Sequence, residues 1–162
     1  IPLRLVGSEM CIRDRVIEAG PYLLSEEELV GFARSYDPQW FHTDAEASRE
    51  SPFGGLIASG WHTCAIAMRL VVEAALAGSE SFASPGLEHL RWPNPVRPGD
   101  ALRLVADVIE VRRSESKPTL GILRWRWRLF NQRELMVLDV EVTSLFRLRD
   151  AESDLALRHQ VP

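Results

Sequence analysis

Residues 51–68 (SPFGGLIASGWHTCAIAM) contain no Lys, Arg, Asp or Glu, and this uncharged segment constrains the fold more than any other feature of the chain. A membrane-spanning helix needs about 20 apolar residues, but Pro, Gly, Ser and His interrupt the first half of the segment. A turn that leads into a buried helix therefore fits better than a membrane span. We expect that helix over residues 60–77, because they are apolar around nearly the whole helical circumference.

Sequence patterns on both sides of this helix predict an α+β domain. Residues 16–24 are expected to form an edge strand with a kink at Gly20-Pro21. Later segments alternate between apolar and polar residues, as is typical of half-buried strands: they are residues 84–92, 101–113, 119–131 and 134–149, with a hairpin turn at 131–133. This order predicts a single domain in which an antiparallel β-sheet wraps around the long central helix.

The stretch between the first strand and the central helix predicts two further helices. Ser25 and Glu28 form a capping box at the start of the first helix. Asp37-Pro38 is expected to end that helix, because the residue before a proline disfavours the helical conformation. A loop over residues 38–42 is expected next, followed by a short helix through Arg49 that Thr43 and Glu46 open as a second capping box.

Composition excludes several classes of function. The length of 162 residues suits one domain, and the hydrophobic content of 46% is too high for a disordered chain. The net charge of −4 gives no general attraction to nucleic acid or to an anionic membrane. Residues 124–128 (RWRWR) could contact bases, but strict alternation is also typical of a half-buried strand, which we favour. We expect no nucleic-acid partner and no membrane partner.

The two ends of the chain are expected to lie outside the domain, which we place at residues 16–149. Residues 6–15 (VGSEMCIRDR) resemble the translated read-through of a sequencing adapter, so residues 1–15 are expected to be non-native or disordered. Residues 150–162 are expected to form a frayed polar tail. Two cysteines cannot form a disulfide framework; this favours a reducing compartment, and we expect a cytoplasmic protein.

The residues best suited to chemistry lie just before the central helix. Asp37 and His42 flank the expected loop, and a carboxylate with an imidazole can hold a water and transfer protons near neutral pH. Residues 54–61 are rich in glycine, and the free N–H groups at a helix start can stabilise an oxyanion. Spacing alone leaves a structural role open for both features, as a helix end with a loop histidine and as a close-packed turn.

Three blocks in a fixed order resemble the MaoC-like dehydratases, the (R)-specific enoyl-CoA hydratase branch of the hotdog fold. They are FARSYDPQWFHTD (32–44), SPFGGLIASGWHT (51–63) and LRWPNPVRPGD (90–100). The resemblance extends over about residues 16–149. It implies a hotdog domain, in agreement with the element order above.

The resemblance also implies an active site. Asp37 and His42 fall on the family's catalytic pair, and the main-chain N–H of Gly60 falls on the group that receives the thioester oxygen. Water held by the pair would add to a trans-2-enoyl-CoA and give a (R)-3-hydroxyacyl-CoA. Further contacts to the acyl-CoA substrate are expected from Phe41, Gly55, Ser59 and Trp61. No cofactor is expected, and no metal site, because the histidines lack the spacing of metal ligands.

Several positions depart from the family's pattern and leave the choice of substrate open. Gln39 and Trp40 stand where the family often has Asn-Pro, Ser59 where it often has His, and Met68 where some members have Ser. Two alternatives therefore stay open: a hotdog acyl-CoA thioesterase, and a non-catalytic acyl-thioester-binding subunit. The resemblance further implies a homodimer or larger homo-oligomer, in which pairing would cover an exposed sheet edge.

Overall fold

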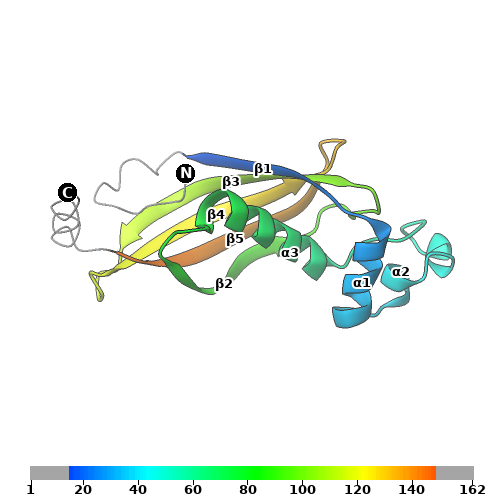
Figure 1. Cartoon of the computed structure of the whole chain (residues 1–162), viewed down its shortest axis with the longest axis horizontal. Coiled ribbons are helices and arrows are strands. Elements are labelled where there is room, and N and C mark those ends of the chain that lie inside the picture. The colour runs from blue at the N-terminus through cyan, green and yellow to red at the C-terminus, as the bar shows by residue number, and fades with distance from the viewer. Residues whose placement is uncertain (1–14, 149–162) are drawn as a thin grey trace, which may run out of the picture.

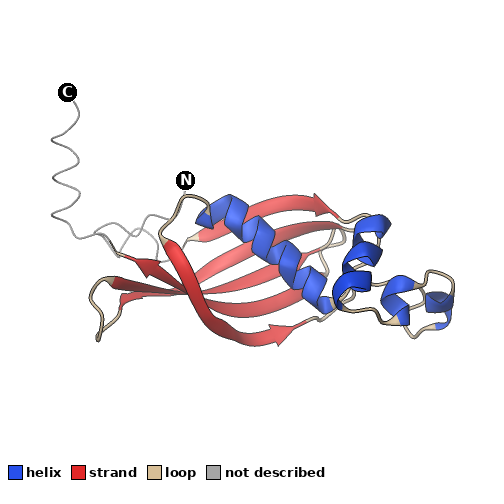
Figure 2. Cartoon of the chain, turned by 60° about the horizontal axis from the view of Figure 1, so that its bottom comes forward, coloured by secondary structure: helices blue, strands red, loops and turns tan. Residues whose placement is uncertain are grey.

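A computed structural model of the chain describes residues 15–148, in which a five-stranded sheet of order β1-β3-β4-β5-β2 curves around one long helix (Figures 1 and 2). The elements are β1 (Val16–Leu23), α1 (Glu26–Tyr36), α2 (Trp40–Thr43), η1 (Ala47–Glu50), α3 (Gly60–Val71), η2 (Val72–Leu76), β2 (Ser81–Arg91), β3 (Ala101–Arg113), β4 (Leu120–Phe130) and β5 (Met136–Arg147). All strand pairs are antiparallel. The predictions for residues 1–14 and 150–162 lie outside the described residues.

The predicted central helix is confirmed as α3 and η2, which follow one another from Gly60 to Leu76. Its last turn, η2, is a π-helix. One side of α3 is buried over the sheet, and the exposed side carries an ion pair of 3.0 Å between Arg69 Nε and Glu73 Oε1. Within the part of the chain that the structure describes, no helix is long and apolar enough to cross a membrane.

Strand β4 confirms that the Arg–Trp alternation belongs to a half-buried strand. Trp125 and Trp127 are buried on the side of α3, and Trp125 Nε1 donates to Ser144 Oγ at 3.1 Å. The arginines between them lie on the opposite face and pair with carboxylates of the neighbouring strands. These ion pairs join Arg124 to Glu141, Arg126 to Asp139 and Arg128 to Asp107. The arginine charges are therefore already paired within the sheet.

The two edges of the sheet differ. Strand β1 pairs with β3 and has a register shift between Ala19 and Tyr22, which confirms the predicted kink. Strand β2 pairs with β5 and begins at Ser81, earlier than the expected residue 84. None of the β2 side chains is buried. Because β2 is the last strand of the sheet, its outer edge has no strand partner among residues 15–148.

The prediction for residues 38–49 is partly wrong. Trp40–Thr43 already form the short helix α2, so that His42 lies on a helix and not in a loop. The Thr43 hydroxyl does not cap a helix, because it donates to the Gln39 carbonyl four residues back at 3.1 Å. Asp44 accepts instead from the N–H groups of Glu46 and Ala47. A carboxylate at Asp44 competes better for these donors than a hydroxyl already used within its own turn.

The core assignment predicts the effect of a leucine substitution in β4. Leu129→Ala is expected to lower the free energy of unfolding by about 2–5 kcal/mol, because it removes a fully buried side chain and leaves a cavity. Leu135→Ala is the matched control, since Leu135 is 40% exposed, and its effect is expected to stay within about 0.5 kcal/mol. Urea denaturation measures both values. Equal losses at the two positions would contradict the placement of Leu129 in the core.

Candidate active site

Asp37 and His42 lie side by side where α1 gives way to α2. Asp37 is the C-cap of α1, and its N–H donates to the Ala33 carbonyl at 2.8 Å, before Pro38 ends the helix. His42 lies on α2 and is 5% exposed. Its Nε2 is 3.3 Å from Oδ2 of Asp37. The structure therefore brings together the two side chains that the sequence pointed to.

The backbone fixes the orientation of the His42 ring. Nδ1 of His42 lies 2.7 Å from the Ile57 carbonyl oxygen, which can only accept, so Nδ1 carries the proton of this hydrogen bond. In the neutral ring, Nε2 then has a free lone pair beside the Asp37 carboxylate. In the protonated ring, Nε2 carries an N–H that can bond to Asp37. The pair is thus arranged to accept a proton at Nε2 and to stabilise the charge that results.

Two side chains hold the Asp37 carboxylate. Ser59 Oγ donates to Oδ2 at 2.7 Å, and Gln39 Nε2 donates to Oδ1 at 2.8 Å. The hydrogen bond from Ser59 is the largest cause of a lowered pKa at Asp37, with Gln39 and His42 adding to it against the opposing effect of burial. Asp37 is therefore ionised at neutral pH. Gln39 departs from the family's pattern, yet its amide reaches the carboxylate.

Ser59 also connects this carboxylate to the start of α3. It is the N-cap of the helix, and its hydroxyl accepts from the Trp61 N–H at 3.3 Å while donating to Asp37. Gly60 follows as the first helical residue, where N–H groups lack intrahelical partners and the helix dipole is positive. The Ser59 hydroxyl thus connects the Asp37–His42 pair to a helix start of the kind that can stabilise an oxyanion.

Gly60 is required by a close contact that the sequence analysis did not identify. A Cβ at Gly60 would lie 2.5 Å from Cε2 of Trp92, closer than real side chains approach one another. Trp92 follows β2 and belongs to the third block of the family resemblance, but nothing in its sequence context shows which residue it covers. The Trp92 indole thus forms a wall beside the start of α3.

The other expected substrate contacts lie at different distances from the Asp37–His42 pair. The Phe41 ring packs against His42 with centroids 4.3 Å apart. Trp61 is 58% exposed and meets the edge of Trp92. Gly55 lies beside the guanidinium group of Arg97. The structure therefore joins Ser59 and Phe41 directly to the pair and leaves Trp61 at the surface.

A second network, which sequence reasoning missed, fixes α1 against α3. The buried His62 stacks on Phe32 with ring centroids 4.3 Å apart, and its Nε2 lies 3.4 Å from Oε1 of Glu28. Glu28 also accepts from the Tyr22 hydroxyl. Burial lowers the pKa of His62, so its ring is mainly neutral at pH 7. Because α1 ends at Asp37 and α3 begins at Gly60, this contact helps to set their separation.

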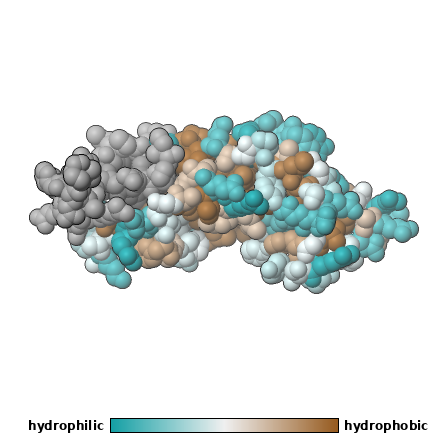
Figure 3. Space-filling view, viewed as in Figure 1, coloured by the Kyte–Doolittle hydropathy of each residue, from teal (hydrophilic) through white to brown (hydrophobic). Residues whose placement is uncertain are grey.

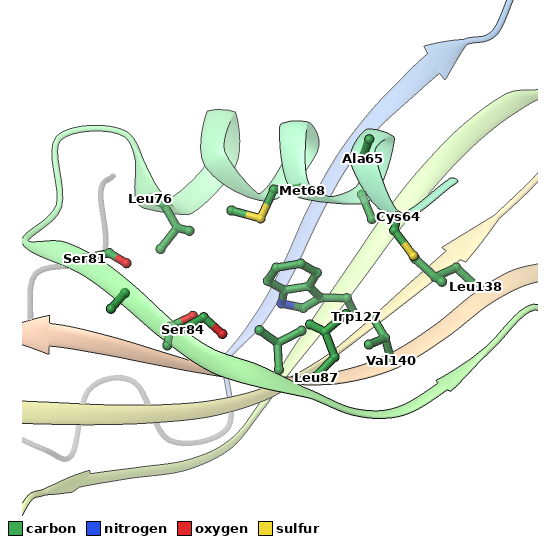
Figure 4. A pocket seen from close by; sticks show the side chains of 14 residues that line it. Cys64, Ala65, Met68, Leu76, Ser81, Ser84, Leu87, Trp127, Leu138 and Val140 are labelled. Carbon is green, nitrogen blue, oxygen red and sulfur yellow. The ribbon is translucent and has the colours of Figure 1, made fainter. Parts of the chain in front are cut away.

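An apolar cavity of about 480 Å³ lies between the central helix and strands β2, β4 and β5 (Figure 4). Its lining includes Cys64, Met68, Leu76, Trp127 and Leu138. Cys64 is half-buried, and its side chain faces the cavity. Figure 3 shows apolar surface interrupting the polar surface on the side of the molecule that α3 crosses. Residues 15–148 contain no group of three or more His, Cys, Asp or Glu side chains that could hold a metal ion.

Comparison with known proteins places this geometry in a family. Residues 12–122 match the family model of the MaoC like domain. The uncharacterized protein YdeM of Bacillus subtilis is 32% identical over 124 residues, which cover 76% of this chain and 86% of YdeM. 3-hydroxyacyl-thioester dehydratase Z of Mycobacterium tuberculosis is 33% identical over 90 residues, 54% of this chain and 60% of that protein. The chain thus spans less than two thirds of the mycobacterial dehydratase.

A solved structure gives the same result at the level of the fold. The crystal structure of the MaoC-like dehydratase from Rhodospirillum rubrum superposes with a TM-score of 0.80 at 36% identity, covering 89% of this chain and 99% of that one. The predicted α+β hotdog architecture is therefore confirmed. The chain belongs to the MaoC-like dehydratase family, a family of acyl-thioester dehydratases and hydratases.

The hydrogen bond from Ser59 predicts a pH effect. Ser59→Ala is expected to raise the pKa of Asp37, because it removes the main cause of the lowered value. A lowered native pKa stabilises the fold above the ordinary value of 3.8, and this contribution disappears as the pH falls through the native pKa. The stability lost in Ser59→Ala should therefore shrink on acidification towards the pH-independent cost of losing an N-cap, about 1 kcal/mol.

Carboxyl NMR titration of Asp37, with urea denaturation at several pH values, tests this expectation. Ser35→Ala is the matched control, because the Ser35 hydroxyl donates to the Gly31 carbonyl on the exposed side of α1. It should leave the pKa of Asp37 unchanged. If the pKa also stays unchanged in Ser59→Ala, the hydrogen bond does not control this carboxylate.

Proposed function

We propose that this protein is an acyl-thioester hydratase/dehydratase that reversibly adds water to a trans-2-enoyl-CoA and forms a (R)-3-hydroxyacyl-CoA. The observation that carries the proposal is the junction at Ser59, where the Asp37–His42 pair meets the start of α3. Hydration needs a side chain that transfers a proton, and it needs a hydrogen-bond donor to the enolate oxygen. The junction at Ser59 offers both. The (R) configuration and the CoA thioester come from the family resemblance.

In the proposed mechanism, the thioester oxygen accepts the Gly60 N–H and a water lies against Asp37 and His42. The free lone pair of His42 Nε2 removes a proton from the water as its oxygen bonds to C3. The C2–C3 π electrons form a C1–C2 double bond, and the carbonyl π electrons move onto the thioester oxygen, whose negative charge the helix start stabilises. The protonated His42 then returns the proton to C2. Asp37 orients the water and stabilises the imidazolium, and its lowered pKa makes it a poor proton donor.

An assay of two signals separates this function from its alternatives. Crotonyl-CoA and a longer trans-2-enoyl-CoA are offered, and enoyl absorbance and free thiol are followed separately. Loss of absorbance without thiol is the expected result. Free thiol would instead identify a thioesterase, and binding with neither signal would identify a non-catalytic subunit.

Substitution of the pair tests the assignment of residues. Asp37→Asn and His42→Ala are each expected to lower kcat about 10²–10⁴-fold, because each removes a group of the proton-transfer pair. His89→Ala is the matched control: His89 Nε2 lies 3.2 Å from Asp139, and that carboxylate is held by Arg126 on the face of the sheet away from α3. It should retain full activity. Full hydratase activity in both Asp37→Asn and His42→Ala would refute the assignment.

We also propose that the protein is a homodimer that pairs along β2. No β2 side chain is buried in the single chain, and Phe82 and Leu87 are 57% and 48% exposed. The unpaired backbone of this edge is a template for a second strand, and a second copy of β2 would cover it. The family resemblance implies a homodimer as well, without naming the strand at its interface.

Sedimentation velocity tests the dimer. The protein is expected to sediment with twice the mass of one chain, and Phe82→Lys is expected to shift the equilibrium towards the monomer, since it places a charge in the apolar contact. Ile109→Lys is the matched control, because Ile109 is 47% exposed but lies on β3. A monomeric wild type, or equal effects of both substitutions, would argue against pairing along β2.

A further inference from the structure

Trp92 occupies a fixed place between the sheet and the start of the central helix. It directly follows β2, and the loop that it begins lies against the segment before α3, where the Ala58 N–H donates to the Val96 carbonyl at 2.8 Å. Asn94 anchors the same loop by donating to the Met136 carbonyl at 2.9 Å. The position of the indole is therefore set by the backbone on both sides of it.

The indole covers the first turn of α3. Three neighbouring ring atoms, Cε2, Cδ2 and Cζ2, lie 2.5, 2.8 and 2.8 Å from the place of a Cβ at Gly60, so the ring lies with its face over this residue. The Trp92 side chain also lies close to the Cys64 thiol, one turn further along the helix, where it lowers the pKa of that thiol against the larger raising effect of burial. The ring therefore extends from Gly60 to Cys64.

Gly60 and Cys64 lie in different parts of the structure. Gly60 begins the helix beside the Asp37–His42 pair, whereas Cys64 lines the apolar cavity together with Met68 and Leu76 (Figure 4). Neither Gly60 nor the pair is among the residues that line the cavity. Trp92 lies against Gly60 and close to Cys64, and thus between the Asp37–His42 pair and the cavity.

We propose that Trp92 is a specificity-determining residue that closes the passage between the catalytic pair and the apolar cavity and so limits the length of the acyl chain. This inference rests on the proposed function. With the thioester oxygen at the Gly60 N–H and C3 at the pair, the chain beyond C4 is directed along the first turn of α3 and meets the indole. Short enoyl thioesters fit without moving the ring, and longer ones reach the cavity only when the ring is displaced.

Chain-length profiles test the proposal. For Trp92→Ala, the ratio of kcat/KM for trans-2-octenoyl-CoA to that for crotonyl-CoA is expected to rise at least tenfold over wild type. Trp92→Phe keeps a smaller ring over Gly60, and should change the ratio in the same direction by less. Ile109→Ala is the matched control, since Ile109 is 47% exposed against 43% for Trp92 and lies on β3, away from the pair. A ratio within twofold of wild type in both folded Trp92 variants would overturn the proposal.

A double-mutant cycle gives an independent test. Met68→Ala enlarges the cavity beyond the passage, so it should favour octenoyl-CoA strongly only when Trp92→Ala is also present. Equal effects of Met68→Ala in both backgrounds would show that the passage is already open and would overturn the proposal.

Binding of saturated thioesters separates the two proposals. Calorimetry with butyryl-CoA and octanoyl-CoA needs no turnover. Trp92→Ala should raise the affinity for octanoyl-CoA relative to butyryl-CoA at least tenfold, like the ratio of kcat/KM values. If this shift occurs while no variant hydrates an enoyl-CoA, the passage stands and the proposed reaction fails. If hydration occurs and the affinities do not shift, Trp92 does not limit chain length.

Discussion

The candidate site depends on the hydroxyl of Ser59. It donates to Asp37 and accepts from the first turn of α3, so one oxygen connects two elements that lie 22 residues apart in the chain. Because a hydroxyl has a single hydrogen, its donation to Asp37 leaves only acceptor capacity for the helix. The direction of both hydrogen bonds is thus determined by the ionised state of the carboxylate.

The elements that the sequence predicts well are those governed by local pattern. The central helix and the strands follow from hydrophobic periodicity, and Pro38 marks the end of α1 correctly. The segment around Asp44 was misassigned, because two neighbouring residues could both cap a helix and only the folded backbone decides between them. Hydrophobic periodicity does not show which of the two residues caps the helix.

The sequence points to candidate residues for the site but not to the contacts that join them. The spacing and the family resemblance brought forward Asp37, His42 and Gly60. The contact of Trp92 with Gly60, and the stacking of His62 on Phe32, join elements far apart in sequence. Such contacts depend on how closely two backbones approach, and a single sequence does not contain that distance. Gly60 is the only sign of this close approach in the sequence, and a glycine at this position fits a turn equally well.

The π-helical turn η2 has a consequence for the direction of the side chains that follow it. In an α-helix, residues four apart drift by about 40° around the axis, since four residues exceed one turn of 3.6. In a regular α-helix, a row that starts at Cys64 and Met68 would therefore be rotated by about 120° at its fourth member, Leu76. The wider turn from Val72 to Leu76 advances less per residue and reverses that drift. Leu76 thereby stays in line with Cys64 and Met68, and the far end of the cavity is defined by the winding of the backbone.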